Sequence, residues 1–534
     1  MVFLTQSCGS SSGSDTASAQ TTDSGGGSGG SVADSASSMG TGDVVYSDLS
    51  GGSGKVSLPS SGTFEVLLQS QATGSSTNTF TLTSISASGK SLGLGNVESD
   101  LTLDAPPLSS QDLLDSTLRD GEKNFESQPI GKSMAKFFES SKSVSKGVDP
   151  GVSQSVSVGD TANFKVLNSL TDTSSCVTVT ATVKYVGSEV AIYIDNEILS
   201  GNAADLPQSD IDSLGAIYTS QLPDERSWFG AYSDIDKNGV AVALISSQVN
   251  KLGASGGGIV TGFFNSDDLS GSGSCSNSRE IVYLVSPDSA GLYGTKISNS
   301  FYMSNFAPAV FPHEMQHLIN HYQGVILKGR SAETSCLNEG LSHLAEDLVG
   351  YGRENYSRYN LFLAAPQSYS ACSSTSLAGR GAIYLFLRYL YERSGSSKTF
   401  LKSMVQSTTT GYDNIVAAYP DKSSDFDSIG KFLRQWAVAL GYSDRITTGT
   451  KFKYNARVKN STTLNWEGAC MTCKSEDGRG TTLTGPSYGT FSAGTSYSIK
   501  DGATRFLRIS GNPSSLNFSG TAAAKGQAII LRTQ

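Results

Sequence analysis

The chain has 534 residues, a formal net charge of −9 at pH 7 and a pI near 5.1. Because single hydrophobic cores stop growing at about 300 residues, this length predicts roughly two to four domains. The acidic balance argues against a nucleic-acid partner. The sequence contains no apolar run of about 18 residues, so it offers no candidate membrane-spanning helix.

The first residues resemble the end of a bacterial lipoprotein signal. Residues 1–8 place an apolar stretch and Ser7 before Cys8, and Gly9 follows. Lipid on Cys8 would anchor the chain to a membrane. Residues 9–42 are mostly Ser, Gly, Thr, Ala and Asp, which predicts a flexible tether; an ordinary disordered terminus is the alternative. We therefore expect a secreted or cell-surface protein of the bacterial envelope.

Cysteine usage also favours an oxidising compartment. The chain has seven cysteines, and if Cys8 carries lipid, the other six can form three disulfides. The last two lie in a C-x-x-C motif, but the sequence near it has neither the histidines of a zinc site nor the βαβ pattern of a redox fold. The expected pairs are Cys176 with Cys275, Cys336 with Cys372, and Cys470 with Cys473.

Residues 43–204 form a β-rich region. Alternating apolar residues between Gly/Ser turns predict a sandwich-like module, with one short helix in a polar insertion. The strands are expected at 63–69, 79–83, 153–158, 162–167, 177–185 and 190–194, and the helix at 132–139.

Residues 205–445 mix strands with helices, and residues 446–534 return to short strands, which predicts a C-terminal β module. A mixed sheet is expected from strands at 240–245, 258–264 and 280–285. Helices are expected at 211–222, 309–323, 335–349, 379–394, 398–406, 412–419 and 424–441.

A short acidic segment before the first of these strands has the start of a calcium loop. Asp234, Asp236 and Asn238 have the right spacing for Ca²⁺ ligands. The acid that an EF-hand needs at its twelfth position is replaced by Ile245. A tight turn and a simpler calcium-binding turn both fit this segment.

The sequence His313-Glu-Met-Gln-His317 carries the clearest chemistry. All four histidines of the chain lie between His313 and His343. On a helix, His313 and His317 share one face and can hold one zinc ion, while Glu314 can act as a general base. A catalytic zinc ion needs a third protein ligand. His321 extends the same face by about 6 Å, which overshoots the ion.

The third ligand follows from a resemblance. Asn338-Glu339-Gly340, on the next expected helix, resembles the gluzincin metallopeptidases, in which a glutamate after the H-E-x-x-H helix completes the site. Four positions further on, these enzymes have an aspartate, whereas this chain has His343, which we expect to orient a ligand or contact substrate. His343 also remains a rival ligand. The glycine and histidine of the metzincin pattern are absent.

The region from about 160 to 445 is similar to the hyicolysin family of bacterial neutral metallopeptidases. This resemblance implies an α+β fold with a zincin-like catalytic domain flanked by β-sandwich-like modules. It implies one catalytic Zn²⁺ and protein or peptide substrates. The segments that carry it are His313–Asn320, Leu337–His343, Arg380–Leu390 and Lys431–Leu440, with weaker support from Ala181–Gly187 and Ile192–Asp195.

We therefore expect a zinc endopeptidase. The tyrosine that stabilises the oxyanion in related aminopeptidases is replaced by Ala378, which leaves Tyr322, Tyr369, Tyr384 and His343 as alternatives. A surface adhesin or binding lipoprotein with an inactive zincin scaffold is the second hypothesis. An aminopeptidase is a third, but the chain lacks a Gly-x-Met-Glu-Asn type motif before the zinc helix.

Overall fold

The computed structural model describes residues 38–87, 109–127, 155–271, 273–372, 375–446, 452–474, 481–489, 493–509, 513–520 and 522–534. Cys8, most of the expected tether and the helix expected at 132–139 lie outside these ranges. Among the described residues, no helix combines the length and the apolar character that crossing a membrane requires.

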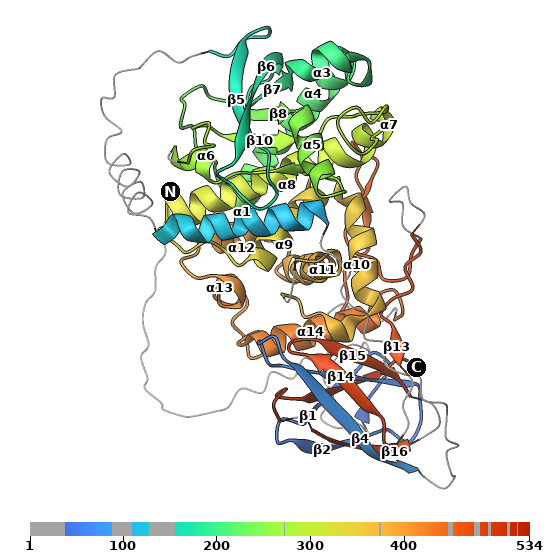
Figure 1. Ribbon diagram of the computed structural model, residues 1–534. Helices are drawn as coiled ribbons and strands as arrows, with labels where there is room; N and C mark the ends of the chain where they lie inside the picture. The colour runs from blue at the N-terminus through green and yellow to red at the C-terminus, as the bar shows by residue number, and fades with distance from the viewer. Residues whose placement is uncertain are drawn as a thin grey trace, which may run out of the picture.

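The protein is a mixed α+β structure in which a central helical region lies between β-sheets (Figure 1). The upper sheet in Figure 1 has the order β5-β6-β7-β8-β10-β9. Strands β7, β8 and β10 are parallel, and the outer strands pair antiparallel. The bounds are β5 Thr161–Leu167, β6 Cys176–Val186, β7 Val190–Asp195, β8 Ala241–Ile245, β9 Gly262–Phe263 and β10 Ile281–Leu284.

The apolar runs of β7, β8 and β10 are fully buried, as expected for parallel strands covered on both faces. Two expected strands differ from the structure. Only Gly262–Phe263 of the stretch 258–264 is a strand, and residues 155–158, the described part of the stretch 153–158, lie outside the strands.

The helices expected from the hydrophobic pattern are present, with shifted ends. Their bounds are α4 Gln208–Phe229, α8 Ala307–Asn320, α9 Ser335–Leu348, α11 Leu377–Arg393, α12 Lys398–Val405, α13 Gly411–Ala418 and α14 Ile429–Tyr442. Within the described ranges, three further helices of eight or more residues were not expected: α1 Ser110–Ser127, α5 Ser247–Ser255 and α10 Asn355–Ala364. Helix α8 continues into a π-helical turn, His321–Ile326.

The strands at the two ends of the chain share their sheets. One sheet has the order β1-β17-β3-β15-β13 and the other β14-β4-β16-β2. The bounds are β1 Val44–Asp48, β2 Ser53–Ser57, β3 Phe64–Gln69, β4 Thr77–Ala87, β13 Tyr488–Gly489, β14 Ser496–Lys500, β15 Thr504–Arg508, β16 Pro513–Ser519 and β17 Gln527–Arg532. A short pair, β11 Val458–Lys459 and β12 Trp466–Glu467, lies apart from them.

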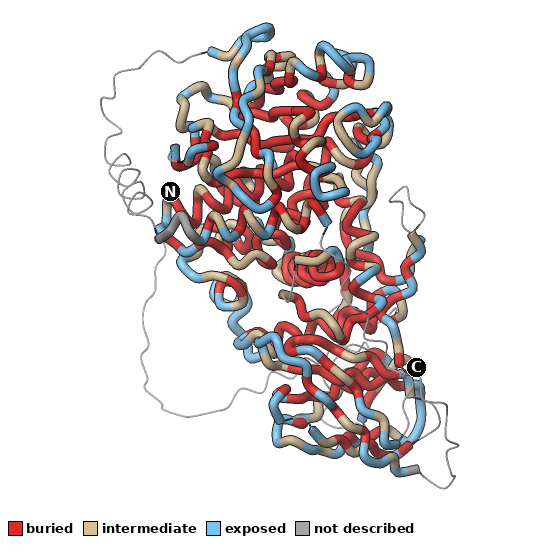
Figure 2. Tube along the Cα trace, in the orientation of Figure 1, coloured by how far each residue is buried: buried red, intermediate tan, exposed pale blue. Residues whose placement is uncertain are grey.

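This pairing differs from the separate N- and C-terminal β modules that the sequence suggested. Strands β1–β4 pair with strands from residues 446–534, whereas β5–β7, which were assigned to the N-terminal region, join the upper sheet. The physical reason is that alternation along a strand reveals its buried face but not its partner. The two shared sheets enclose one hydrophobic cluster, and the sheet containing β3 also packs its other face on the helices (Figure 2).

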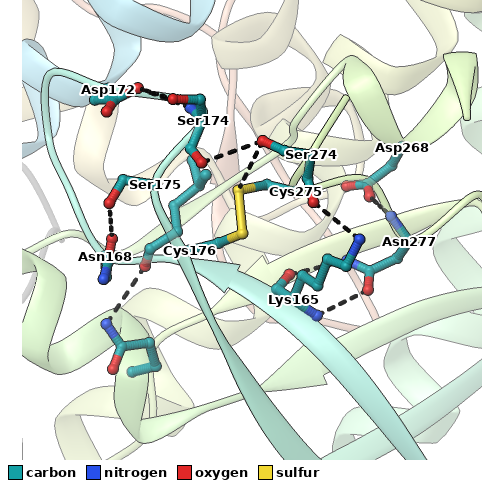
Figure 3. Close-up of a disulfide and its surroundings, with 12 residues drawn as sticks. Lys165, Asn168, Asp172, Ser174, Ser175, Cys176, Asp268, Ser274, Cys275 and Asn277 are labelled. Atoms are coloured by element: carbon teal, nitrogen blue, oxygen red, sulfur yellow. Dashed lines mark hydrogen bonds between the residues drawn. A yellow bond between two sulfur atoms is a disulfide. The ribbon is translucent and has the colours of Figure 1, made fainter. Parts of the chain in front are cut away.

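Three disulfides are present among the described residues, and all three expected pairs are confirmed. Cys176–Cys275 joins the start of β6 to the segment before β10. Figure 3 shows the bonds beside it, in which Ser274 Oγ donates to the Ser174 carbonyl at 3.1 Å and Lys165 Nζ donates to the Ser274 carbonyl at 2.8 Å. Cys336–Cys372 ties α9 to the segment before α11, and Cys470–Cys473 closes a local loop.

Candidate metal centre

Helices α8 and α9 bring the three expected metal ligands together. His313 and His317 lie one turn apart on α8, and Glu339 lies on α9. His313 Nε2 is 3.6 Å from Glu339 Oε2, and His317 Nε2 is 3.5 Å from Glu339 Oε1. The potential ligand atoms of all three residues lie within 4.8 Å of one another.

Two prolines in α8 are compatible with this placement. Pro308 lies near the start of α8, directly after the π-helical turn Tyr302–Phe306. Pro312 lies in the helix as well, directly before His313. Gly340, next to Glu339, permits a close approach of α11, because a Cβ atom there would lie 2.4 Å from Ile383 Cγ1. The Asn-Glu-Gly sequence therefore combines a ligand with a packing requirement.

Hydrogen bonds hold the imidazole rings of His313 and His317 so that Nε2 of each ring faces Glu339. His313 Nδ1 lies 2.7 Å from Glu346 Oε1, and His317 Nδ1 lies 3.1 Å from Asn338 Oδ1. Both acceptors select the tautomer with a proton on Nδ1, which leaves Nε2 free to bind a metal. Oε1 of Glu339 is buried and has no hydrogen-bond partner. Two imidazole nitrogens and one carboxylate oxygen suit Zn²⁺.

Burial and charge favour a cation at this position. Burial raises the pKa of Glu314 to about 8; His313 opposes this, while Asp115 and Glu339 add to it. Burial alone would lower the pKa of His313, but its bonds with Glu339 and Glu346 raise it to about 10. The carboxylates thus attract positive charge to the group, and a divalent cation could supply it.

The other candidate histidine ligand, His317, has a neutral ring. Burial, followed by the positive charge of Arg119, holds the pKa of His317 well below its usual range. A neutral imidazole is the form that binds a metal ion.

Three residues of the site were missed in the sequence. Glu346 lies seven residues after Glu339 on α9, so the shared helix face was a usable signal. Arg380 donates to Glu339 Oε2 at 2.8 Å and also binds Asp115 of α1. Asp115 and Arg380 are 265 positions apart, and no sequence pattern linked them.

The remaining histidines take different places. His343 Nδ1 lies 2.9 Å from Glu346 Oε1, and its ring centroid is 4.8 Å from that of His313. His343 therefore belongs to a second potential group, His313–His343–Glu346, that adjoins the first. Among the described residues, His321 is in no group that could hold a metal. Its ring centroid lies 6.0 Å from that of Phe264.

The alternatives for oxyanion stabilisation lie in varied surroundings. Tyr384 is fully buried and stacks with Tyr359 at a centroid distance of 6.1 Å. Tyr369 packs against the central hydrophobic cluster. Burial and the charge of Glu280 raise the pKa of Tyr322.

The acidic segment before β8 gains a member that the sequence did not suggest. Carboxylate oxygens of Asp234, Asp236 and Glu280 lie within 4.8 Å of one another. The side chain of Asn238 donates to Asp236 Oδ2 at 2.8 Å and accepts from the Val240 amide at 2.8 Å. Glu280 directly precedes β10, far from Asp234 and Asp236 in the sequence, and the fold brings the three residues together. Calcium binding at this segment stays a prediction.

No protein-family model matches the chain, and no curated protein matches it either.

Proposed function

We propose that the protein is an extracytoplasmic zinc-dependent endopeptidase. One observation carries this proposal: His313, His317 and Glu339 converge, and Glu314 lies beside the first of them. Their order and spacing along the chain resemble those of the gluzincins. The three disulfides support an oxidising compartment.

The chain supplies the groups that peptide hydrolysis needs. A zinc ion held by His313, His317 and Glu339 would act as a Lewis acid that lowers the pKa of water and polarises the scissile carbonyl. The positive charge of the ion would also lower the pKa of Glu314, so that its carboxylate could accept the proton of the attacking water and donate it to the nitrogen of the leaving amine. Glu346 holds the His313 ring in place during this cycle.

The test compares zinc content and proteolysis in wild type and Glu314→Gln. We expect one zinc ion per chain in both proteins, and a loss of at least about 100-fold in casein cleavage in the variant, since general-base catalysis contributes about 10²–10⁴-fold. Glu197→Gln is the matched control, because Glu197 pairs with Lys251 at the surface.

A wild-type protein without zinc, or a Glu314→Gln variant as active as wild type, contradicts the proposal. Zinc-loaded wild type that binds a protein tightly without cleaving it favours the alternative of a binding lipoprotein with an inactive scaffold. Lipid on Cys8 is tested separately by mass spectrometry of the protein from its native membrane.

A further inference from the structure

Helix α1 buries a charged face. The charged side chains on this face are each at most 8% exposed, and Asp120 and Lys123 on the other face are exposed. Burying charges is costly unless they are paired, so this face requires partners on the rest of the molecule. The buried charged residues are Asp112, Asp115, Arg119 and Glu122, spaced three or four apart on one helix face.

Arg380 connects this face to the candidate metal centre. One terminal nitrogen of its guanidinium group donates to Asp115 and lies 3.2 Å from Asp112 Oδ1. The other donates to Glu339 Oε2 at 2.8 Å. Arg119 pairs with Glu122 at 3.0 Å on the same helix. A single guanidinium group thus binds both α1 and a candidate metal ligand.

Gln111 fixes the start of α1 to the edge of the upper sheet. Its Oε1 accepts from the Thr261 amide at 2.7 Å, and its Nε2 donates to the Gly262 carbonyl at 3.0 Å. Gly262 belongs to β9, the last strand of that sheet. This strand lies against α8, because a Cβ atom at Gly262 would be 2.5 Å from Val310 Cγ1. Helix α1 therefore occupies backbone groups next to the metal-bearing helix.

We propose that α1 is an internal inhibitory segment that closes the candidate metal centre, and that its displacement admits substrate. This proposal rests on the peptidase function proposed above. The three candidate ligands and Glu314 are at most 6% exposed, so α1 limits the access of a polypeptide to them and keeps the wild-type rate low. In Figure 1, α1 crosses in front of the helices that carry the site.

The contact between α1 and Arg380 is of a kind that can be broken reversibly. The carboxylates of Asp112 and Asp115 regain hydration when α1 leaves, which offsets part of the lost ion pairing with Arg380. Leu114 and Leu118 are also buried, so displacement exposes these two apolar side chains as well. Arg380 keeps its bond to Glu339 after release and offers its remaining donors to a substrate carbonyl or carboxylate.

The main test is the double variant Asp112→Asn/Asp115→Asn in the full chain. It removes both negative charges from Arg380 with almost no change in shape, and we expect kcat/KM for an internally quenched peptide to rise at least tenfold. The rate at which a chelator removes zinc should rise as well. Asp120→Asn is the matched control on the exposed face of α1, and both rates should equal those of wild type.

A reversible lock tests the same idea in the opposite direction. A Cβ atom at Gly258 would lie 3.4 Å from Ser110 Cβ, close to the spacing of about 3.8 Å that a disulfide requires. Adding Ser110→Cys and Gly258→Cys to the double variant should return both rates to the wild-type level when oxidised. Mild reduction should release them again, and wild type treated in the same way is the control.

The outcomes separate the two proposals. If wild type cleaves peptides and neither rate rises in the folded double variant, the inhibitory role of α1 is wrong and the peptidase function stands. If zinc loss accelerates but no form cleaves any peptide, the peptidase function is wrong and α1 only covers a metal site. Should the double variant not fold, Gln111→Ala, which loosens α1 from β9 without altering a charge, must raise both rates.

Discussion

Within the candidate site, Glu346 binds two imidazoles with one oxygen. Its Oε1 lies 2.7 Å from His313 Nδ1 and 2.9 Å from His343 Nδ1. The bond to His313 fixes the ring that faces Glu339, and the negative charge makes its Nε2 a stronger donor to a metal. With a metal ion held by His313, His317 and Glu339, Glu346 would act on its affinity through His313.

Replacing Glu346 should weaken zinc binding in two steps. Glu346→Gln keeps an acceptor oxygen but loses the charge, and we expect about a tenfold loss of zinc affinity; Glu346→Leu removes both and should lose up to about 100-fold. Competition with a chromogenic chelator measures the affinity. Glu392→Gln serves as control, since Glu392 is also buried but pairs with Arg388. Equal affinities in all four proteins would contradict this role.

Asp268 makes stability depend on pH. The residue is fully buried, and burial raises its pKa to about 7, although the Asn277 amide and the Tyr283 hydroxyl donate to it. A raised carboxyl pKa means that the folded state holds the proton more tightly than the unfolded chain. Its stabilising contribution is therefore complete below pH 4 or so and is lost as pH rises through about 7.

Asp268→Asn should flatten this dependence. A rise of about three pKa units corresponds to about 4 kcal/mol. Between about pH 4 and pH 8, the unfolding free energy of wild type should therefore fall by several kcal/mol more than that of the variant. Urea unfolding at a series of pH values measures both. The difference between the proteins isolates Asp268, because every other titrating group is shared. Parallel curves for the two proteins would contradict the assignment.

The site was predictable only where its residues share local spacing. His313, Glu314 and His317 follow from positions i, i+1 and i+4 of one helix, and Glu339 from its place on the next. The contacts of Arg380 were not predictable, because its partners Asp115 and Glu339 come from distant segments. Electrostatic pairing between remote elements leaves no periodic trace in a sequence.

At the scale of elements, the sequence pattern predicted most helices with an apolar stripe, but it missed the short helices α5 and α10 and also α1, whose buried face is charged. Helices α8 and α9 carry apolar residues at helical spacing, so their existence followed from the pattern. Helix α1 buries carboxylates and exposes Asp120 and Lys123, so the same rule placed its residues in a polar insertion. Strand partners stayed hidden for a related reason, because pairing across the chain depends on topology.

The disulfide Cys176–Cys275 joins elements that lie 99 positions apart in the chain. A crosslink that closes so long a loop restricts the unfolded chain strongly. In the chain-entropy model, a disulfide that closes about 100 residues contributes about 4.7 kcal/mol to stability, and typical measured contributions are about 2–4 kcal/mol. We expect Cys176→Ala/Cys275→Ala to lower the unfolding free energy by about 2–4 kcal/mol. Zinc content should not change, because this disulfide joins two segments outside α8 and α9. Denaturant unfolding with metal analysis checks both, and a loss of zinc at unchanged stability would contradict the expectation.

For the whole molecule, the two ends of the chain are built into one β unit that is seated on the helices. Gln69 of β3 donates to the Leu433 carbonyl at 3.0 Å, and Tyr442 donates to the Asp43 carbonyl at 2.6 Å. Gly441 of α14 permits close packing, since a Cβ atom there would lie 2.7 Å from Leu531 Cδ1. The β unit and the helical region therefore share a hydrophobic cluster, which predicts that they unfold together.

Leu67 and Leu68 of β3 test this cooperativity. Both are fully buried, but Leu67 belongs to the cluster shared with the helices and Leu68 to the one between the two sheets. Each substitution by Ala should lower stability by about 2–5 kcal/mol. Trp228, Trp436 and Trp466, the three tryptophans of the chain, all lie outside the two shared sheets, so their fluorescence reports on the rest of the molecule.

If the whole molecule unfolds in one transition, tryptophan fluorescence and far-UV circular dichroism must give the same urea midpoint for each variant. Each substitution must therefore shift the two midpoints equally. Leu68→Ala is the decisive case, because its side chain lies on the face of β3 away from the helices. A Leu68→Ala protein whose circular dichroism shifts while its fluorescence midpoint stays at the wild-type value would show that the β unit unfolds independently. The shared cluster around Gly441 predicts the opposite, since loss of the sheet would uncover α14 and remove its packing.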